Sequence, residues 1–202
     1  MVHRMKSVMH GTTTVGLKIR DAVILAADKR ASQGYYVAHK KVKKIVKIDD
    51  HVAMTTAGLV ADAQMLASHL SLISRKYRIE NNARISIKAL ASYLSILLNS
   101  SKYFPYEVQL LIGGYDSAPR LYALTWFGDL FEENYTVTGS GSPVAVGVLE
   151  TGFSEDLSVD EAVELAVKAV RSAIKRDVFT GEAVDVAVID KEGVKFLSFG
   201  KE

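Results

Sequence analysis

The sequence of 202 residues contains no cysteine. This absence excludes disulfide frameworks, thiolate metal sites and cysteine nucleophiles. The sequence also has no run of about eighteen uncharged apolar residues, the length that a membrane-spanning helix needs. Charged or polar residues interrupt every apolar stretch of residues 1–11, so this segment lacks the pattern of a signal peptide. We therefore expect a cytoplasmic protein with no membrane partner.

Several common catalytic and cofactor-binding motifs are also absent. The phosphate-binding pattern GxxxxGK(S/T), the zinc protease pattern HExxH and the hydrolase pattern GxSxG do not occur. The five histidines, at positions 3, 10, 39, 51 and 69, lack the spacing of metal ligands. The sequence therefore predicts neither a metal nor a cofactor.

Beyond the first eleven residues, basic and acidic side chains are equal in number. Residues 1–11 carry Arg4, Lys6 and no acidic residue, which leaves 23 of the 25 basic side chains against 23 acidic ones. A formal net charge of zero gives no general attraction for nucleic acid or anionic membranes. The lysines at 40–47 are too local a cluster to change this. A neutral surface fits burial in an assembly.

The apolar pattern predicts one α+β domain. Ser86 is expected to cap a helix, and Ser158 with Glu161 forms a capping box before another. Because strands and helices come in blocks, we expect antiparallel sheets with helices layered outside. Strands are expected at 13–19, 22–27, 35–38, 42–48, 51–57, 107–113, 120–126, 131–137, 184–190 and 193–199, and helices at 59–77, 86–101, 143–150 and 159–175.

Gly11 and Thr12 introduce a run of β-branched residues after a short, polar-interrupted segment. The simplest interpretation is an N-terminal strand with a loose tail. A threonine hydroxyl is a poor nucleophile, however, and no suitably placed histidine could act as its base. An N-terminal α-amine, with an unperturbed pKa of about 7.7–8.0, can serve as that base. Cleavage between Gly11 and Thr12 would create nucleophile and base together.

Lys44 is an unusual cation in an otherwise apolar strand face. Strand alternation places Lys44 on the same face as Val42, Val46 and Ile48, although a solvated lysine in an irregular strand is an equally good interpretation. A buried Lys44 would need a carboxylate partner. Asp28 is a candidate because it ends an apolar strand face, and its alternative is an ordinary carboxylate at a strand end.

Three further residues have a possible chemical role and a simpler structural one. Asp177 lies at or just past a helix C-terminus, where the helix dipole disfavours negative charge, although salt bridges to neighbouring basic residues would also explain it. Gly58 separates a strand from a helix, where a backbone N–H can point at an oxyanion or simply form a turn. Ser140, between two glycines, could donate a hydrogen bond or only favour a loop.

An ordered series of segments that includes these residues resembles proteasome β-subunits, a branch of the N-terminal-nucleophile hydrolases, and especially those of archaeal type. The resemblance extends from Gly11 to about Ile189. It is carried by GTTTVG at 11–16, DAVILAADKR at 21–30, HKKVKKI at 39–45, MTTAGLVADAQ at 54–64, YEVQLLIGGYD at 106–116, TGSGSPVAVGVLE at 138–150, SVDEAVELAVKAV at 158–170 and RD at 176–177.

The resemblance implies a four-layer αββα sandwich with two antiparallel sheets, the N-terminal-nucleophile hydrolase fold. It also implies that residues 1–11 are a propeptide removed by autocatalysis, which leaves residues 12–202 as a single catalytic domain. Thr12 would then be the nucleophile through its hydroxyl oxygen. The α-amine of Thr12 would be the base.

The remaining catalytic positions follow from the same motifs. Lys44 would tune the nucleophile electrostatically, and Asp28 would hold Lys44. The backbone N–H of Gly58 would stabilise the tetrahedral oxyanion. Ser140 and Asp177 would brace the N-terminal amine.

Two supporting residues, Arg30 and Thr180, belong to the same resemblance. Thr180 stands where the family commonly carries a serine shortly after Asp177. Because a hydroxyl is retained, we expect the same hydrogen bond.

Four residues fall where the family lines its main specificity pocket, and they make this pocket mostly neutral and apolar. Cleavage after hydrophobic residues is therefore expected, in a pocket whose depth depends on the small Thr56. An extended peptide would be held by strand addition near Ser32 and Gly58. The four pocket residues are Ala31, Val42, Val46 and Thr56.

The implied activity is that of a threonine endopeptidase that degrades unfolded proteins to peptides with broad specificity. Heptameric β-rings stacked with α-subunit rings would enclose the sites, and an ATPase regulatory complex would supply substrate. One alternative is a non-catalytic structural β-subunit, which would be expected to have lost Thr12, Lys44 or Asp28. All three are present. A second alternative is another N-terminal-nucleophile amidohydrolase.

Overall fold

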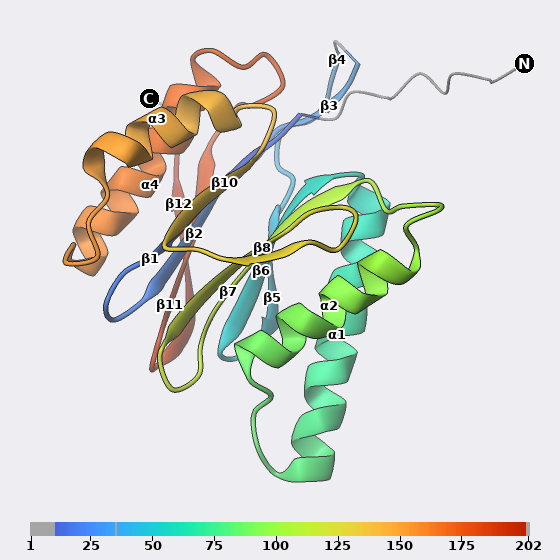
Figure 1. Ribbon diagram of the computed structural model, residues 1–202. Helices are drawn as coiled ribbons and strands as arrows, with labels where there is room; N and C mark the ends of the chain where they lie inside the picture. Colours follow the sequence, from blue (N-terminus) through green and yellow to red (C-terminus); the bar gives the residue numbers. More distant parts are fainter. Residues whose placement is uncertain (1–10, 35, 201–202) are drawn as a thin grey trace, which may run out of the picture.

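The computed structural model of the protein describes residues 11–34 and 36–200. Two five-stranded antiparallel sheets lie face to face, with two helices outside each sheet (Figure 1). The predicted four-layer αββα sandwich is therefore confirmed. Residues 1–10, which make up most of the predicted propeptide, lie outside the described residues.

The first sheet carries the start of the described chain at its interior. Its strands follow the order β10 (Tyr135–Gly139), β1 (Thr13–Lys18), β2 (Val23–Asp28), β11 (Val184–Asp190) and β12 (Gly193–Phe199). A hairpin at the predicted turn joins β1 to β2, where the N–H of Ile19 donates to the carbonyl of Ala22 at 3.0 Å. Thr12 therefore precedes an interior strand that is paired on both sides, to β10 and to β2.

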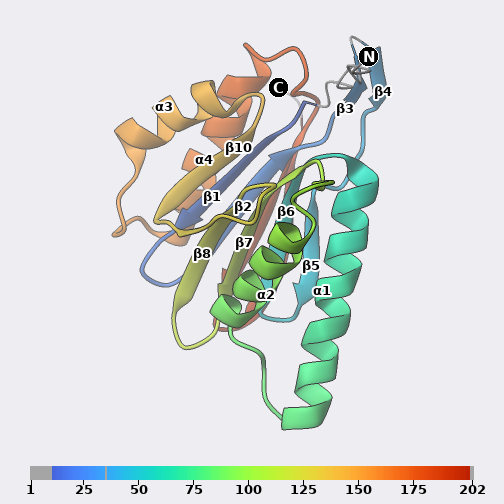
Figure 2. The ribbon, with the colours of Figure 1, turned by 45° about the vertical axis from the view of Figure 1, so that its right-hand side comes forward.

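The second sheet has the order β5 (Ile45–Asp49), β6 (Val52–Gly58), β7 (Val108–Tyr115), β8 (Pro119–Leu124) and β9 (Leu130–Glu132). A separate hairpin of β3 (Ala31–Gln33) and β4 (Tyr36–His39) extends beyond one end of the two sheets (Figure 2). This hairpin lies at the end of the sandwich where Thr12 is placed.

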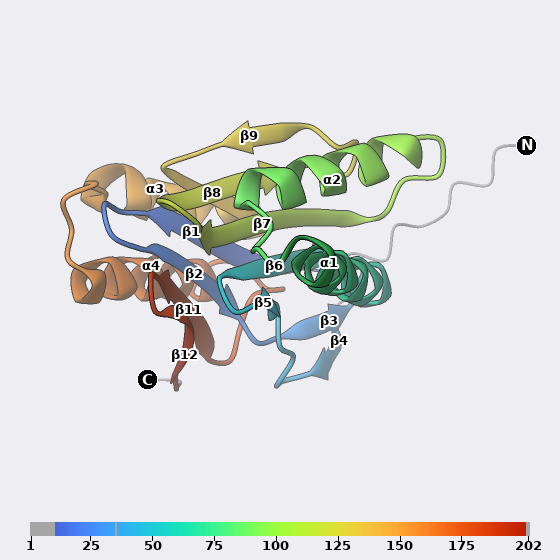
Figure 3. The ribbon, with the colours of Figure 1, turned by 90° about the horizontal axis from the view of Figure 1, so that it is seen from below.

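Two pairs of helices cover the outer faces of the sheets (Figure 3). The second sheet is covered by α1 (Val60–Asn81) and α2 (Ile87–Ser100), and the first by α3 (Ser142–Gly152) and α4 (Val159–Ile174). Each helix buries one apolar stripe, as helical periodicity predicts. Among the described residues, no helix is both long and apolar enough to cross a membrane.

The core has three apolar layers, as expected when two sheets are packed between helices. One layer joins α3 and α4 to the first sheet, and another joins α1 and α2 to the second. The third lies between the two sheets and includes Val23 and Leu25 from one side and Ala53 and Leu111 from the other. Apolar side chains of β2, β6 and β7 therefore hold the two sheets together, next to β1, the strand that follows Thr12.

Two predicted strands differ from the observed elements. The predicted strand at 131–137 divides into β9 and β10, which belong to different sheets, because the chain crosses between the sheets at Glu133 and Asn134. The predicted strand at 42–48 begins only at Ile45, because the N–H of Val42 donates to the carbonyl of Lys29 at 3.0 Å and not to a sheet ladder. The alternation of apolar and polar residues within a segment does not show which strand or loop its backbone will bond to.

The first helix ends four residues later than the apolar stripe predicts. It continues past residue 77 with mostly exposed side chains and ends at Asn81. Asn82 follows in the left-handed conformation with φ of 48°, which is a common way to end a helix. The stripe therefore marked the packed part of the helix and not its end.

The predicted caps of α2 and α4 are confirmed. Ser86 accepts from the N–H of Ala89 at 3.2 Å, and Ser158 and Glu161 form both bonds of a capping box. We expect Ser158→Ala to lower the free energy of unfolding by about 1 kcal/mol, because an N–H of the first turn loses its acceptor. Thermal or denaturant unfolding measures this effect.

Ser172→Ala is the matched control for this change, because it replaces the same residue type inside the same helix. The Ser172 hydroxyl donates to the carbonyl of Lys168, which already accepts within the helix, so its removal is expected to leave stability equal or slightly higher. An equal loss in both variants would contradict the capping role of Ser158.

Candidate active site

Thr12 is buried at the end of the sandwich, one residue before β1. Its hydroxyl donates to the carbonyl of Gly11 at 2.8 Å, and its N–H donates to Ser140 Oγ at 3.3 Å. The hydroxyl of Thr12 therefore lies against the peptide unit that joins Gly11 to Thr12. The N–H of Thr12 is held by Ser140, the residue that directly follows β10.

Lys44 and Asp28 form a buried ion pair beside Thr12. Lys44 Nζ lies 2.6 Å from Asp28 Oδ1, and the side chains are 6% and 0% exposed. Asp28 ends β2 of the first sheet and Lys44 directly precedes β5 of the second, so the pair connects the two sheets. Burial lowers the pKa of the Lys44 ammonium below its ordinary value, and the charge of Asp28 opposes part of that effect.

Asp28 is fixed by three backbone donors in addition to Lys44. Its Oδ1 accepts from the N–H of Thr13 at 3.0 Å, and its Oδ2 accepts from those of Arg30 at 3.0 Å and Gly181 at 2.9 Å. A buried carboxylate with four donors has its hydrogen-bonding capacity well satisfied. Asp28 therefore fixes both the ammonium of Lys44 and the backbone next to Thr12.

A chain of hydroxyl groups connects Ser140 to the start of β1 through Asp177. Ser140 Oγ donates to Asp177 Oδ2 at 2.5 Å, and the hydroxyl of Thr180 donates to the same oxygen. Thr180 Oγ1 in turn lies 2.7 Å from Thr13 Oγ1. Asp177, which lies just beyond α4, therefore bonds to Ser140, the residue that accepts from the N–H of Thr12.

Arg30 holds the loop that follows Asp177. Its guanidinium donates to the carbonyl of Val178 at 2.9 Å and to Glu182 Oε1 at 3.0 Å. The same loop supplies the N–H of Gly181 to Asp28. Arg30 therefore supports the site from its rim.

The backbone conformation at the end of β6 requires a glycine at position 58. Its φ is +114°, and a Cβ at this position would lie 2.0 Å from the carbonyl oxygen of Glu107. Both constraints admit glycine alone among the common residues. Gly58 lines the same pocket as Thr12.

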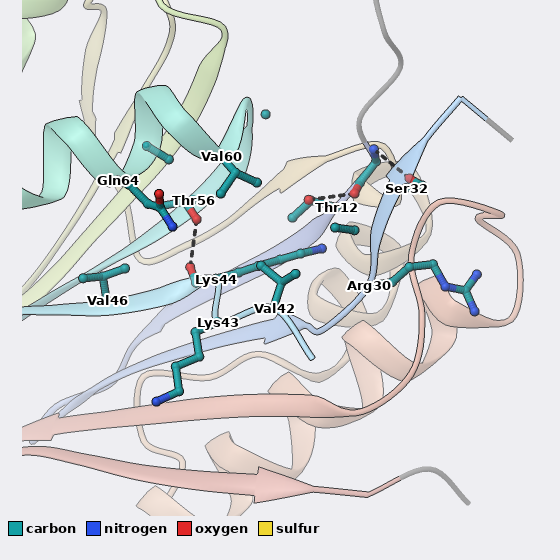
Figure 4. A pocket seen from close by; sticks show the side chains of 14 residues that line it. Thr12, Arg30, Ser32, Val42, Lys43, Lys44, Val46, Thr56, Val60 and Gln64 are labelled. Atoms are coloured by element: carbon teal, nitrogen blue, oxygen red, sulfur yellow. Dashed lines mark hydrogen bonds between the residues drawn. The ribbon is translucent and has the colours of Figure 1, made fainter. Parts of the chain in front are cut away.

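A pocket opens beside Thr12 between the β3 hairpin, the start of β5 and the start of α1 (Figure 4). Thr56 closes one side, where its N–H and hydroxyl both donate to the carbonyl of Lys44, at 2.9 and 3.3 Å. The predicted residues that line this pocket are Gly11, Thr12, Arg30, Ala31, Ser32, Val42, Lys44, Val46, Thr56 and Gly58.

The sequence did not indicate four further residues of the pocket. Val60, Ala63 and Gln64 come from the first turns of α1, and Lys43 lies beside Lys44. Positions three and four apart share a helix face, so the first turns of α1 could have been included once Gly58 was assigned to the site. The anchoring role of Thr13 and Gly181 had no local signal, because both bond to Asp28 through backbone N–H groups.

Comparison with known protein families identifies the family of this chain. The family described as "Proteasome subunit" matches residues 8–189. The chain belongs to this family. Its β-type relatives include "Proteasome subunit beta 2" of Hyperthermus butylicus, 60% identical over 95% of this chain and 90% of the relative.

Other proteasome β-subunits match over similar lengths. "Proteasome subunit beta 2" of Ignicoccus hospitalis is 54% identical over 92% of this chain and 88% of its own length. "Proteasome subunit beta 1" of Saccharolobus islandicus, strain M.14.25, is 52% identical over 95% of this chain and 91% of its own length. The chain is therefore a β-subunit of the proteasome core, which assembles with other proteasome subunits in the rings of the particle. The alternative of another N-terminal-nucleophile amidohydrolase is not supported.

Proposed function

We propose that this proteasome β-subunit is a catalytic threonine endopeptidase and not a structural member of the ring. The observation that carries the proposal is the position of Thr12. Its hydroxyl lies 2.8 Å from the Gly11 carbonyl oxygen, and Thr12 lines a pocket together with Lys44 of the buried Lys44–Asp28 pair. A subunit that only fills a ring position has no need of a buried cation next to a threonine hydroxyl.

The first reaction is the removal of residues 1–11. The Thr12 hydroxyl oxygen attacks the carbonyl carbon of Gly11 and gives up its proton, and the bond between Gly11 and the Thr12 nitrogen breaks as that nitrogen takes up a proton. Water then hydrolyses the resulting ester. The products are a carboxylate on Gly11 and a Thr12 with a free hydroxyl and a free α-amine.

The second reaction is the hydrolysis of a substrate peptide. The α-amine of Thr12 accepts the hydroxyl proton, and the oxygen attacks the substrate carbonyl carbon. The C–N bond of the substrate then breaks as the leaving amine takes up that proton, and an ester between the substrate and Thr12 remains. Water hydrolyses this ester, which releases a carboxylate product and restores the hydroxyl and the α-amine of Thr12. Ser140, held by Asp177, keeps the amine in place. The ammonium of Lys44 favours the negative charge that develops on the Thr12 oxygen, and the N–H of Gly58 donates to the substrate oxyanion.

The pocket supports a preference for hydrophobic side chains. Its lining includes the apolar side chains of Ala31, Val42 and Val46, while Gln64 adds one polar amide. The edges near Ser32 and Gly58 would pair with an extended backbone, which makes no demand on sequence. Unfolded protein chains are therefore the proposed substrates.

Enclosure explains how such a tolerant peptidase is kept from folded proteins. We propose heptameric β-rings stacked with α-subunit rings, an ATPase regulatory complex that supplies unfolded chains, and a cytoplasmic location. The propeptide adds a second control, because the amine base of Thr12 does not exist until the chain is cut.

A peptidase assay separates the catalytic subunit from the structural one. The full chain is assembled with α-type subunits, and the particles are given fluorogenic peptides that carry a hydrophobic, a basic or an acidic residue before the cleaved bond. The proposal predicts turnover that is fastest for the hydrophobic peptide. Fully assembled particles without turnover, in which this chain is the only β-type subunit, would contradict it.

A further inference from the structure

A cluster of three buried threonines lies behind Thr12, in the layer between the two sheets. Thr14 on β1, Thr55 on β6 and Thr138 on β10 are 0%, 0% and 8% exposed. Thr14 Oγ1 lies 2.6 Å from Thr138 Oγ1 and 3.0 Å from Thr55 Oγ1. This threonine cluster joins two strands of the first sheet to one strand of the second.

Thr14 lies on the same face of β1 as Thr12. Successive side chains of a strand point to opposite faces, so Thr12, Thr14 and Gly16 share one face and Thr13 points to the other. Gly16 faces the second sheet, because a Cβ there would lie 2.8 Å from Leu121 Cδ1. The hydroxyls of Thr12 and Thr14 therefore both face the second sheet.

The hydroxyl groups of the cluster are not needed for packing. Apolar side chains fill much of the layer between the sheets, and valine has nearly the same shape as threonine without a polar group to satisfy. A buried hydroxyl requires a partner in a fixed direction, whereas a methyl group does not. Three hydroxyls that satisfy one another therefore fix the orientation of their strands more narrowly than valines would.

Each member of the cluster lies close in sequence to a residue of the site. Thr14 follows the nucleophile Thr12 by two residues, and Thr138 precedes Ser140 by two. Thr55 precedes Gly58 on the same strand. The cluster thus joins the backbones that carry the nucleophile, the amine brace and the oxyanion donor, which come from different sheets.

Removal of residues 1–11 makes this connection more important. A chain terminus is poorly ordered unless it is tied down. After cleavage Thr12 is a terminus, and an error of about 1 Å in the position of a nucleophile can cost about 100-fold in rate.

We propose that the threonine cluster positions Thr12 in the mature subunit by holding β1 against β6 and β10. This inference rests on the proposed peptidase activity and adds Thr14, Thr55 and Thr138 to it as positioning residues. All three are buried, so they act through Thr12 and not on the peptide.

The test is Thr14→Val, compared with Thr14→Ser, in assembled particles. The valine variant loses both hydroxyl contacts at nearly constant volume, and we expect kcat to fall about 10- to 100-fold while KM stays within about twofold. The serine variant keeps the hydroxyl and is expected to recover most of kcat. Thr136→Val, on the same strand as Thr138 but outside the cluster, is the matched control and is expected to keep the wild-type kcat.

Hydrogen exchange of residues 12–18 gives a second measurement that does not depend on turnover. Faster exchange in Thr14→Val than in Thr14→Ser and wild type would support the inference, as would a failure of the valine variant alone to remove its propeptide. A kcat within about twofold of wild type in Thr14→Val would overturn it. Equal losses of kcat and thermal stability in both Thr14 variants would also overturn it, because they indicate a packing role.

The wild-type particles distinguish this inference from the proposed function. If wild type shows no turnover, the peptidase proposal fails, and the positioning role fails with it. If wild type is active and Thr14→Val is equally active, only the positioning role fails.

Discussion

Replacing Thr12 with alanine is expected to abolish both removal of the propeptide and hydrolysis of peptides. The variant lacks the only hydroxyl that contacts the Gly11 carbonyl among the described residues. Removing the nucleophile of a hydrolase lowers the rate by at least about 10⁴-fold, because the nucleophile and its base act as a unit. Intact mass reports the first reaction, and peptide turnover in assembled particles reports the second.

Thr12→Ser is the matched variant for this prediction. It keeps the hydroxyl and loses only a methyl group, so some removal of the propeptide and some turnover are expected. The alanine variant should still fold, because the N–H that bonds to Ser140 belongs to the backbone. Turnover by Thr12→Ala particles at the wild-type rate would show that another residue is the nucleophile.

Replacing Lys44 with methionine is expected to lower kcat by at least about 100-fold. Methionine keeps much of the length of the side chain but removes the positive charge that favours the developing oxyanion on Thr12. Asp28 keeps its three backbone donors in this variant, so its buried charge remains hydrogen-bonded. Turnover is measured in assembled particles, with thermal unfolding followed in parallel so that a folding defect is recognised.

Lys47→Met is the control, because Lys47 lies on β5 close to Lys44 and pairs with Asp50 at the surface. Surface pairs contribute little to stability, so this variant should resemble wild type. Loss of activity in both variants, or in neither, would remove the special role of Lys44.

The ion pair also predicts a shift in the pH dependence of turnover. Burial lowers the pKa of Lys44, and Asp28 is the main group that raises it again. In Asp28→Asn the ammonium therefore loses its proton at a lower pH than in wild type. The fall in kcat on the alkaline side should move to lower pH, and an unchanged profile would show that Lys44 does not need its charge.

The helical layers of the fold could be predicted from periodicity, because each helix buries one regular face. Strands such as β1, β2 and β6 are buried on both faces and show no regular alternation. The helices after Ser86 and Ser158 also carry local caps that mark where they begin. What periodicity could not supply was the partner of each strand. The segment at 131–137 is predicted as one strand, yet β9 and β10 pair in different sheets.

The candidate site, like the fold, could be predicted only in part from the sequence. The pairing of Lys44 with Asp28 follows from two charged residues on apolar faces, since a buried charge needs a partner. Lys44 nevertheless lies before β5 and not inside it, because Val42 bonds to Lys29 outside the ladder. The anchors at Thr13 and Gly181 act through backbone groups, which carry no sequence signal.

The threonine cluster could not be predicted at all. Thr14, Thr55 and Thr138 meet only after the two sheets pack, and threonine in a strand is unremarkable by itself. Long-range polar contacts of this kind depend on register and sheet packing together.

The most direct test of the catalytic assignment is the intact mass and N-terminal sequence of this subunit after assembly with α-type subunits. The account predicts that wild type begins at Thr12 and has lost the mass of residues 1–11, while Thr12→Ala stays full length. A wild-type subunit that assembles fully and still carries residues 1–11 would contradict it, because no α-amine base would exist at Thr12. The chain would then be a structural β-subunit.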